Sequence, residues 1–177
     1  RKAAHDALTW IGHAAFLVQL GGSSALIDPV MSPKIAGLIP RNVAPGLAWQ
    51  ALPKIDLVLV THNHRDHMDA PTLARLGPDP VYVVPRGLGE WFKRAGLSRV
   101  LEMGWWQEEE VAGIKVSFVP AEHWSRRGLF DVNRSWWGGY VLARGGLRVY
   151  HSGDTAWFEG FGLIGERCGP IDAALLP

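Results

Sequence analysis

The chain of 177 residues contains a single cysteine, Cys168. One thiol cannot form an intramolecular disulfide, and it cannot build a metal site made of cysteines alone. The sequence therefore excludes a disulfide-stabilised fold within this chain. A scarcity of thiols is typical of proteins in a reducing compartment, so we expect a cytoplasmic location.

Long apolar runs and an excess of charge are also missing. No apolar stretch approaches the ~20 residues that a transmembrane helix needs, so we expect no transmembrane segment. The formal net charge is +1, and no run of Lys or Arg exceeds two residues. A near-neutral chain lacks the electrostatic footprint of a nucleic-acid-binding protein, and we expect no nucleic-acid partner.

What remains is an ordinary globular composition. Hydrophobic residues make up 47% of the chain and charged residues 20%. A chain of this length and composition can bury a substantial core. We therefore expect one globular domain over residues 1–177.

The arrangement of apolar residues predicts a mixed α/β fold. Asp69 is placed to cap a helix that has Pro71 in its first turn and ends at Gly77. Further helices are predicted at 87–96 and 157–167, an irregular loop at 31–53 and an acidic turn at 107–110. Strands are predicted at 7–11, 14–20, 24–29, 55–61, 81–85, 99–103, 114–121, 138–144, 147–150 and 171–177, the last of them buried. Because antiparallel hairpins come first and helices later, the pattern favours a sandwich over a doubly wound sheet.

The segment VTHNHRDHMDA, residues 60–70, concentrates side chains that bind metals. In extended backbone His62 and His64 share a face, so they can bind one metal ion together. Asp66 and His67 follow where the chain turns toward the helix, and they can face a second position nearby. Imidazole and carboxylate suit Zn²⁺, with Mn²⁺ and Fe²⁺ as alternatives. Because Zn²⁺ takes about four ligands, others are expected from elsewhere in the chain.

Two residues outside this segment are candidates for the remaining ligands. His123 ends the segment VSFVPAEH, and Asp154 lies in HSGDT after another predicted strand. Side chains at strand ends are often presented into a shared cleft. Each residue alone would more often be structural, so both depend on the motif at 62–67 for their interpretation.

With these motifs in view, the chain resembles the metallo-β-lactamase superfamily of hydrolases. THNHRDH matches the H-x-H-x-D-H signature of that superfamily, and GDT matches the motif of its metal-bridging aspartate. Within it, the chain is most similar to the N-acylphosphatidylethanolamine-hydrolysing phospholipase D-like group, through LTWIGHAAFLV, LIDPVMS, GWWQEE, AEHW, WWGGYVL, SGDTAWF and GPIDAALLP in that order. The resemblance covers nearly the whole chain and implies an α/β fold of the αββα sandwich type.

The resemblance also implies roles for individual residues. His62, His64 and His123 would bind a first metal ion. Asp66 and His67 would bind a second, and Asp154 would bridge the two ions. Asp66 would in addition be the catalytic residue, orienting the attacking water and accepting its proton. His13 and Asp28 would brace the ligands through hydrogen bonds. A structural role is favoured for His151, and His5 is expected at the surface.

The implied activity is that of a zinc-dependent hydrolase with two metal ions. Two ions lower the pKa of a water molecule and neutralise charge in the transition state, so no Ser or Cys nucleophile is needed. The subgroup implies a phosphodiester in a small-molecule or lipid-like substrate, with which peripheral membrane contact is compatible. A lactonase or β-lactamase-like enzyme is the alternative among hydrolases. A zinc-binding domain without turnover is the alternative outside them.

Nine tryptophans are many for a chain of this length. Core packing is the favoured interpretation, because Trp buries a large area. Walls of an apolar pocket for acyl chains are the other interpretation. The pairs Trp105–Trp106 and Trp136–Trp137 cannot both point inward if they lie on strands.

The resemblance further implies that this chain is part of a longer protein. The family continues beyond the strand predicted at 171–177 with a segment that carries another histidine for the second metal. None of the seven histidines here is left over for that role in the sequence pattern. We therefore expect the C-terminal part of the sandwich to be missing, and the second metal to bind more weakly than the first.

Overall fold

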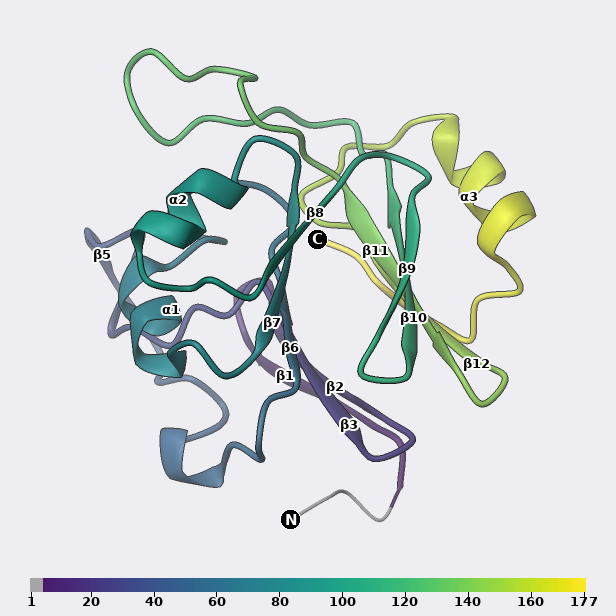
Figure 1. Ribbon diagram of the computed structural model, residues 1–177, viewed down its shortest axis with the longest axis horizontal. Helices are drawn as coiled ribbons and strands as arrows, with labels where there is room; N and C mark the ends of the chain where they lie inside the picture. Colours follow the sequence, from purple (N-terminus) through teal and green to yellow (C-terminus); the bar gives the residue numbers. More distant parts are fainter. Residues whose placement is uncertain (1–4) are drawn as a thin grey trace.

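The computed structural model describes residues 5–177, in which two β-sheets pack face to face between helices (Figure 1). Helices α1 (Ala70–Leu76) and α2 (Gly89–Arg94) cover the outer face of one sheet. Helix α3 (Gly160–Cys168) covers the outer face of the other. The layers therefore follow the order α, β, β, α, which confirms the αββα prediction.

The first sheet combines antiparallel and parallel strands. Its order is β1-β2-β3-β6-β7-β8. The first three strands pair antiparallel, whereas β3, β6, β7 and β8 run parallel. Parallel neighbours need crossover connections, and α1 and α2 lie in two of these crossovers. The bounds are β1 (Ala7–Gly12), β2 (Ala15–Leu20), β3 (Ser23–Ile27), β6 (Leu57–Leu59), β7 (Val81–Pro85) and β8 (Val100–Met103).

The second sheet is mostly antiparallel. Its order is β13-β12-β11-β10-β9, and only the pair β12–β13 is parallel. The bounds are β9 (Glu108–Val111), β10 (Ile114–Val119), β11 (Gly139–Arg144), β12 (Leu147–His151) and β13 (Ala173–Leu175). The long connection from β3 to β6 adds a small hairpin and a short 3₁₀ helix, namely β4 (Lys34–Ile35), β5 (Ile39–Pro40) and η1 (Trp49–Ala51). The sequence had predicted only an irregular loop there.

Alternating side chains on the strands build three apolar layers. Val58 of β6 packs toward α1 and α2, whereas Leu57 and Leu59 face the second sheet. Tyr150 of β12 packs with Ile164 of α3 on the far side of the second sheet. Because successive side chains of a strand point to opposite faces, strands buried on both faces must be apolar throughout, as IDLVLVT is.

Helix α1 begins and ends where its sequence predicts. Asp69 is the N-cap, and its carboxylate accepts a hydrogen bond from the backbone N–H of Thr72. Pro71 lies in the first turn, and Gly77 follows the last turn with a φ of 73°. These signals act between residues within one turn of each other, so they set the helix bounds locally. Within residues 5–177, no helix has the length and apolarity to cross a bilayer.

The acidic segment predicted as a turn is in fact a strand. Glu108–Val111 forms β9, antiparallel to β10 at the edge of the second sheet. The ammonium of Lys115 lies 2.7 Å from a carboxylate oxygen of Glu108 on the neighbouring strand. Cross-strand pairing at a solvated edge overrides the low strand propensity of Glu, and edge charges discourage further pairing.

Two predictions near the C-terminal end also differ from the structure. The strand at 171–177 was expected to be buried, but in β13 Ala174 is exposed and its neighbours are half-buried. The reason is that β13 pairs with β12 alone. Helix α3 starts at Gly160 rather than Trp157, because Ala156 is held in a β-bridge to Glu122.

The prediction that the tryptophans pack in the core is confirmed only in part: Trp49, Trp91 and Trp106 pack against the core from its margin. All nine lie in the described part of the chain, and none of them is buried. Trp10 is 63% exposed and Trp157 is 87% exposed. The core volume is filled instead by aliphatic side chains with Tyr82, Phe92, Phe118 and Tyr140. Trp is large and carries an N–H donor, so partial burial at loops satisfies it more easily than the interior of a thin sheet sandwich.

Candidate metal centre

The candidate ligands come from strand ends that meet at one edge of the sandwich. The H-x-H-x-D-H loop follows β6, and Asp28 follows the neighbouring parallel strand β3. The second sheet supplies His123 after β10 and Asp154 after β12. His13 lies in the tight connection between β1 and β2. Residues more than a hundred positions apart are thereby brought to one place.

Three imidazoles form the first cluster, which we call the three-histidine cluster: His62, His64 and His123. Nε2 of His62 lies 2.9 Å from Nδ1 of His64. Nε2 of His123 lies 3.2 Å from each of those two nitrogens. Ligands bound tetrahedrally at ~2.0–2.1 Å from one Zn²⁺ would lie about 3.3 Å from each other. The three nitrogens therefore have nearly the spacing that one metal ion requires.

A buried hydrogen-bond chain sets the tautomer of His62. The carboxylate of Asp28 can only accept, so the hydroxyl of Thr61 donates to it at 2.6 Å. The same hydroxyl oxygen lies 2.9 Å from Nδ1 of His62 and must accept from it. Nδ1 of His62 therefore carries the proton, and the lone pair of Nε2 points toward His64 and His123. Such bracing of a ligand by a carboxylate is characteristic of metal sites.

Asp28 orients a second histidine in the same way. Nδ1 of His67 lies 2.8 Å from the Asp28 carboxylate, and both side chains are fully buried. Nε2 of His67 is buried and has no hydrogen-bond partner, although the carboxylate of Asp154 lies 3.1 Å away in an off-line direction. A buried ring nitrogen left without a partner, beside carboxylates, fits a site for a cation.

The carboxylates of Asp66 and Asp154 both lie near Nε2 of His67, and we call these three residues the acid cluster: Asp66, His67 and Asp154. The Asp66 carboxylate lies 3.8 Å from Nε2 of His67. It also accepts a hydrogen bond of 3.1 Å from Nε2 of His13. This bond is the largest cause of the low pKa of Asp66, about 2, so the carboxylate is ionised at neutral pH.

His13 lies nearer to the acid cluster than the sequence suggested. One ligand atom from each of His13, Asp66 and His67 lies within 4.8 Å of the others, as close as ligands of one ion. The sequence pattern had left no histidine for this position. The hydrogen bond fits a bracing contact and the spacing fits a ligand, so the bracing role of His13 stays a prediction.

Asp154 contacts only part of the predicted ligand set. It lies beside His67, but among the described residues it belongs to no group whose ligand atoms all lie within 4.8 Å of one another, neither that of His62, His64 and His123 nor that of His13, Asp66 and His67. Its role as a bridge between two metal ions therefore stays a prediction. Gly153 makes its position attainable: the residue has a φ of 62°, and a Cβ there would lie 2.5 Å from the carbonyl oxygen of Gly138.

Two bracing residues have unusual backbone conformations. His13 has a φ of 54° and Asp28 a φ of 42°, in the left-handed region that side chains other than glycine rarely adopt. Each such conformation costs on the order of 1–3 kcal/mol. Strain at two residues of one site indicates that their side-chain positions are held by the surrounding contacts.

The two clusters differ in protonation. Burial, together with neighbouring imidazoles, lowers the pKa of His62 well below 6.5, and burial is the largest cause of the lowered pKa of His64 and His123. Burial also acts to lower the pKa of His67, but the carboxylates of Asp28 and Asp154 outweigh it and raise that pKa to about 10.

Sequence reasoning missed three residues that hold the site together. Thr61 relays the hydrogen bond from His62 to Asp28, and no sequence signal distinguishes it from any strand threonine. Trp124 packs edge-on against His64, with ring centroids 4.5 Å apart. Arg127 donates to the backbone carbonyls at both ends of the histidine loop, Asn63 and Met68.

The remaining histidines have no place in either cluster. His151 is buried; its Nε2 donates to the carbonyl of Ala14, and its Nδ1 accepts from the backbone N–H of Gly153. It therefore ties the β1–β2 connection to the segment that carries Asp154, the structural role that the sequence favoured. His5 is exposed, as expected.

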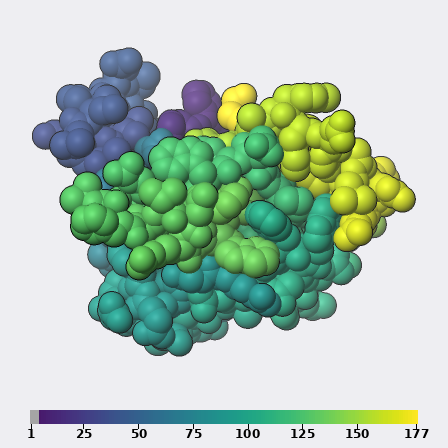
Figure 2. Space-filling model, turned by 90° about the horizontal axis from the view of Figure 1, so that it is seen from above, coloured from purple at the N-terminus to yellow at the C-terminus, as the bar shows by residue number. Residues whose placement is uncertain are grey.

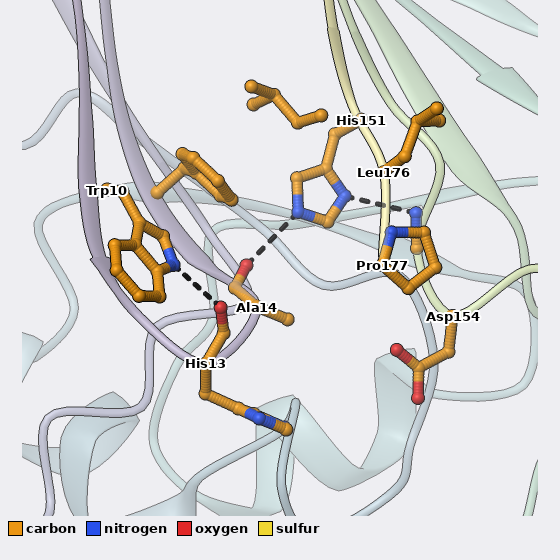
Figure 3. Close-up of a pocket in the computed structure, with 10 residues that line it drawn as sticks. Trp10, His13, Ala14, His151, Asp154, Leu176 and Pro177 are labelled. Carbon is orange, nitrogen blue, oxygen red and sulfur yellow. Dashed lines mark hydrogen bonds between the residues drawn. The ribbon is translucent and has the colours of Figure 1, made fainter.

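Two hollows adjoin the clusters. One, of about 470 Å³, is lined mainly by apolar groups that include Trp10 and Phe16, with Asp154 at its rim (Figure 3). The other, of about 530 Å³, has a basic lining of Arg65, Arg126 and Arg127. The candidate ligands thus lie between an apolar and a cationic surface.

The family model described as the beta-lactamase superfamily domain matches residues 24–177. Among curated proteins, the chain is 35% identical to N-acyl-phosphatidylethanolamine-hydrolyzing phospholipase D 1 of Caenorhabditis elegans, over 96% of this chain and 52% of that protein. It is also 35% identical to a metal-dependent hydrolase of Pyrococcus furiosus, over 96% of this chain and 71% of that protein. The chain spans about half the length of the phospholipase that it matches.

Two solved structures have the same fold. The diiron β-hydroxylase CmlA of Streptomyces venezuelae superposes with a TM-score of 0.74 and 27% identity, over 97% of this chain and 34% of that one. Igni18, a metallo hydrolase of Ignicoccus hospitalis, superposes with a TM-score of 0.70 and 26% identity, over 90% of this chain and 65% of that one. Hydrolysis and oxidation thus both occur on this fold, so the fold alone does not identify the reaction.

Proposed function

This chain belongs to the beta-lactamase superfamily, and from that premise we propose that the protein is a zinc-dependent phosphodiesterase acting on a lipid-like substrate. The observation that carries the proposal is the convergence of three imidazole nitrogens, each 2.9–3.2 Å from the other two. His62 presents an unprotonated nitrogen there, as ligation requires.

We propose that the three-histidine cluster holds a first metal ion and the acid cluster a second, with Asp154 shared between them. When bound, these ions would acidify a water molecule and withdraw charge from the phosphoryl oxygens. Mn²⁺ and Fe²⁺ suit the same ligand types, so metal analysis must accompany every activity measurement.

The proposed work of Asp66 follows from its surroundings. His13 keeps this carboxylate ionised and fixed in orientation, so it can only accept hydrogen bonds at neutral pH. It would orient the attacking water toward the phosphorus and take up its proton transiently. A pKa of about 2 makes Asp66 a weak base, so orientation is the larger part of its role.

The surroundings of the clusters support a phosphodiester with an apolar part. Arginines in the basic hollow would pair with phosphate oxygens. The apolar hollow beside Trp10 and Phe16 would hold hydrocarbon. The nematode relative is a phospholipase of this bond type, and its similarity extends over 96% of this chain.

A substrate panel with defined metal content tests the proposal. The protein is loaded with Zn²⁺, Mn²⁺ or Fe²⁺ and assayed against phosphodiesters, lactones and β-lactams, and His5→Ala serves as a surface control. We expect zinc-dependent release from phosphodiesters that His5→Ala retains and His62→Ala loses. Turnover of lactones or β-lactams alone would assign the site to those hydrolases, and stoichiometric zinc without any turnover would indicate a binding domain.

A further inference from the structure

Six large apolar side chains project from two loops of the structure. Segment 31–46 follows β3 and contains the β4–β5 hairpin, and segment 122–137 connects β10 to β11. The six side chains are between 50% and 85% exposed: Leu38, Ile39, Val43, Leu129, Phe130 and Val132. Large apolar side chains gathered at one place on a surface mark an interaction site rather than a solvated face.

The two loops lie side by side next to the candidate metal centre. One hollow is lined by Lys34 of the first loop together with Arg65 and Arg127. The adjoining hollow is lined by Arg127, Leu129 and His64. In Figure 2 the blue atoms of segment 31–46 and the green atoms of segment 122–137 form one end of the face, and α3 lies at the other. Leu129 thus lies beside the histidine loop, whereas Ile39 and Val43 line a further hollow next to Trp10 and His13.

Basic residues accompany the apolar tips. Segment 31–46 contains Lys34 and Arg41 and no acidic residue. Segment 122–137 contains three arginines against two acidic residues, so the two segments together carry +3, whereas the whole chain carries +1. One of those acids, Asp131, is occupied by backbone N–H groups of its own loop. Arg41 and Arg127 are likewise engaged with backbone carbonyls, so the exposed cations of the surface are Lys34, Arg126 and Arg134. The surface is therefore both apolar and cationic.

Internal hydrogen bonds hold the apolar tips outward. The Asp131 carboxylate accepts from the backbone N–H groups of Arg127 and Gly128, which closes the loop below Leu129 and Phe130. The backbone N–H of Asn133 donates to the carbonyl of Ser125 at 2.8 Å. Arg127 also donates to the backbone carbonyls of Asn63 and Met68, so this loop is in direct contact with the histidine loop.

We propose that segments 31–46 and 122–137 form a docking surface for a lipid bilayer that contains anionic headgroups. The apolar tips enter the boundary between headgroups and acyl chains, and the cations pair with lipid phosphates. The centre of a protein–protein interface is usually depleted of charged residues, so the cations of this surface fit a protein partner less well. The proposal does not depend on phosphodiester hydrolysis, because docking needs no turnover.

Vesicle sedimentation of the wild-type chain tests the docking surface. The same measurement is made on His62→Ala, in which we expect no lipid hydrolysis, so that binding is measured without turnover. Vesicles consist of phosphatidylcholine alone or of phosphatidylcholine mixed with phosphatidylglycerol. We expect stronger binding to the mixture, weakened several-fold by Lys34→Glu. The double substitution L129S/F130S should lower the partition coefficient at least about tenfold, because two apolar tips no longer enter the bilayer. No binding of the wild type, or equal binding of the double variant, overturns the proposal.

A matched control separates binding by this surface from non-specific adsorption of exposed apolar side chains to vesicles. Trp157 is 87% exposed, as Phe130 is 85% exposed, but it precedes α3 at the other end of the face. Trp157→Ser should leave vesicle binding unchanged, and an equal loss would contradict the assignment to the two loops. Thermal unfolding of each variant shows that it is folded.

Two further outcomes distinguish the docking surface from its rivals. If the wild type forms a dimer that L129S/F130S dissociates and no vesicles are bound, the surface serves a second copy and the proposal is wrong. If vesicles are bound as expected but no phosphodiester is hydrolysed, the proposed function fails and the docking surface stands. Hydrolysis of a short-chain soluble phosphodiester by Phe130→Ser alone should equal that of the wild type, because Phe130 lines neither of the hollows beside the metal centre.

Discussion

The three-histidine cluster and the acid cluster lie side by side, but they are prepared for metal in different ways. In the first, burial lowers the pKa of His62, His64 and His123, so lone pairs are available at neutral pH. In the second, carboxylates raise the pKa of His67 to about 10, so its Nε2 holds a proton until a cation displaces it. The two clusters share one loop and can still differ in metal affinity. The three-histidine cluster contains no carboxylate, whereas the acid cluster contains two.

Removal of a histidine from the first cluster should have the largest effect. His62→Ala takes away one ligand and the hydrogen bond to Thr61. We expect a loss of metal affinity of more than about hundredfold, beyond the range for partners that only brace a ligand, and loss of activity with it. Metal content by atomic emission checks this against His5→Ala, which should bind as the wild type does. Unchanged metal content in His62→Ala would remove the cluster from consideration.

A change in the acid cluster should separate turnover from metal content. Asp66→Asn keeps the shape of the side chain but removes its charge. We expect a rate loss of about two orders of magnitude or more, because the water is no longer oriented and its proton has no acceptor. The three-histidine cluster should keep its metal. Near wild-type turnover would contradict the catalytic role.

Removal of the brace behind His62 should have a moderate effect on the three-histidine cluster. Thr61→Val removes the hydroxyl that links His62 to Asp28 and leaves the volume nearly unchanged. We expect metal affinity to fall by about ten- to hundredfold, as for other partners that orient a ligand. Titration with a chromophoric chelator measures this fall. Thr61→Ser retains the hydroxyl and should restore affinity, and failure to do so would indicate a packing effect instead.

The smallest and most specific effect is the pH dependence of metal binding. Binding at the acid cluster must release the Nε2 proton of His67, whose pKa is about 10, so its affinity should rise by up to about tenfold per pH unit from pH 6.5 to 9, as it does at lower pH, and level off near 10. Affinity at the three-histidine cluster should be flat over that window. Calorimetric titration in buffers of different ionisation enthalpy counts the protons released. Equal counts at both clusters would abolish the distinction between them.

The same pKa gives a stability prediction for metal-free protein. The pKa of His67 is raised above its unfolded value, so its contribution to stability is fully present below pH 6.5 and is lost as the pH rises toward 10. Urea unfolding across this range in the presence of chelator should show declining stability. His67→Gln should remove that part of the decline.

Local sequence signals determined a large part of this molecule. Asp69, Pro71 and Gly77 set the bounds of α1, because capping needs only neighbours within a turn. The alternating and continuous apolar runs determined most strands, and the spacing of His62 and His64 placed both imidazoles on one side of an extended segment. The αββα order followed from the family resemblance, and the superposed structures share that fold.

Only the tertiary structure decided which distant residues meet and in which protonation state. The order of strands in the two sheets brings His123 to His62 and Asp154 to His67, across 61 and 87 positions of the chain. It also brings Asp28 and Thr61 together, so that one buried carboxylate orients His62 through Thr61 and orients His67 directly. No spacing rule contains this information, because helix and strand periods describe neighbours along the chain. Which ring nitrogen of a histidine is free to bind a metal depends instead on the acceptor that contacts its other ring nitrogen in the folded structure.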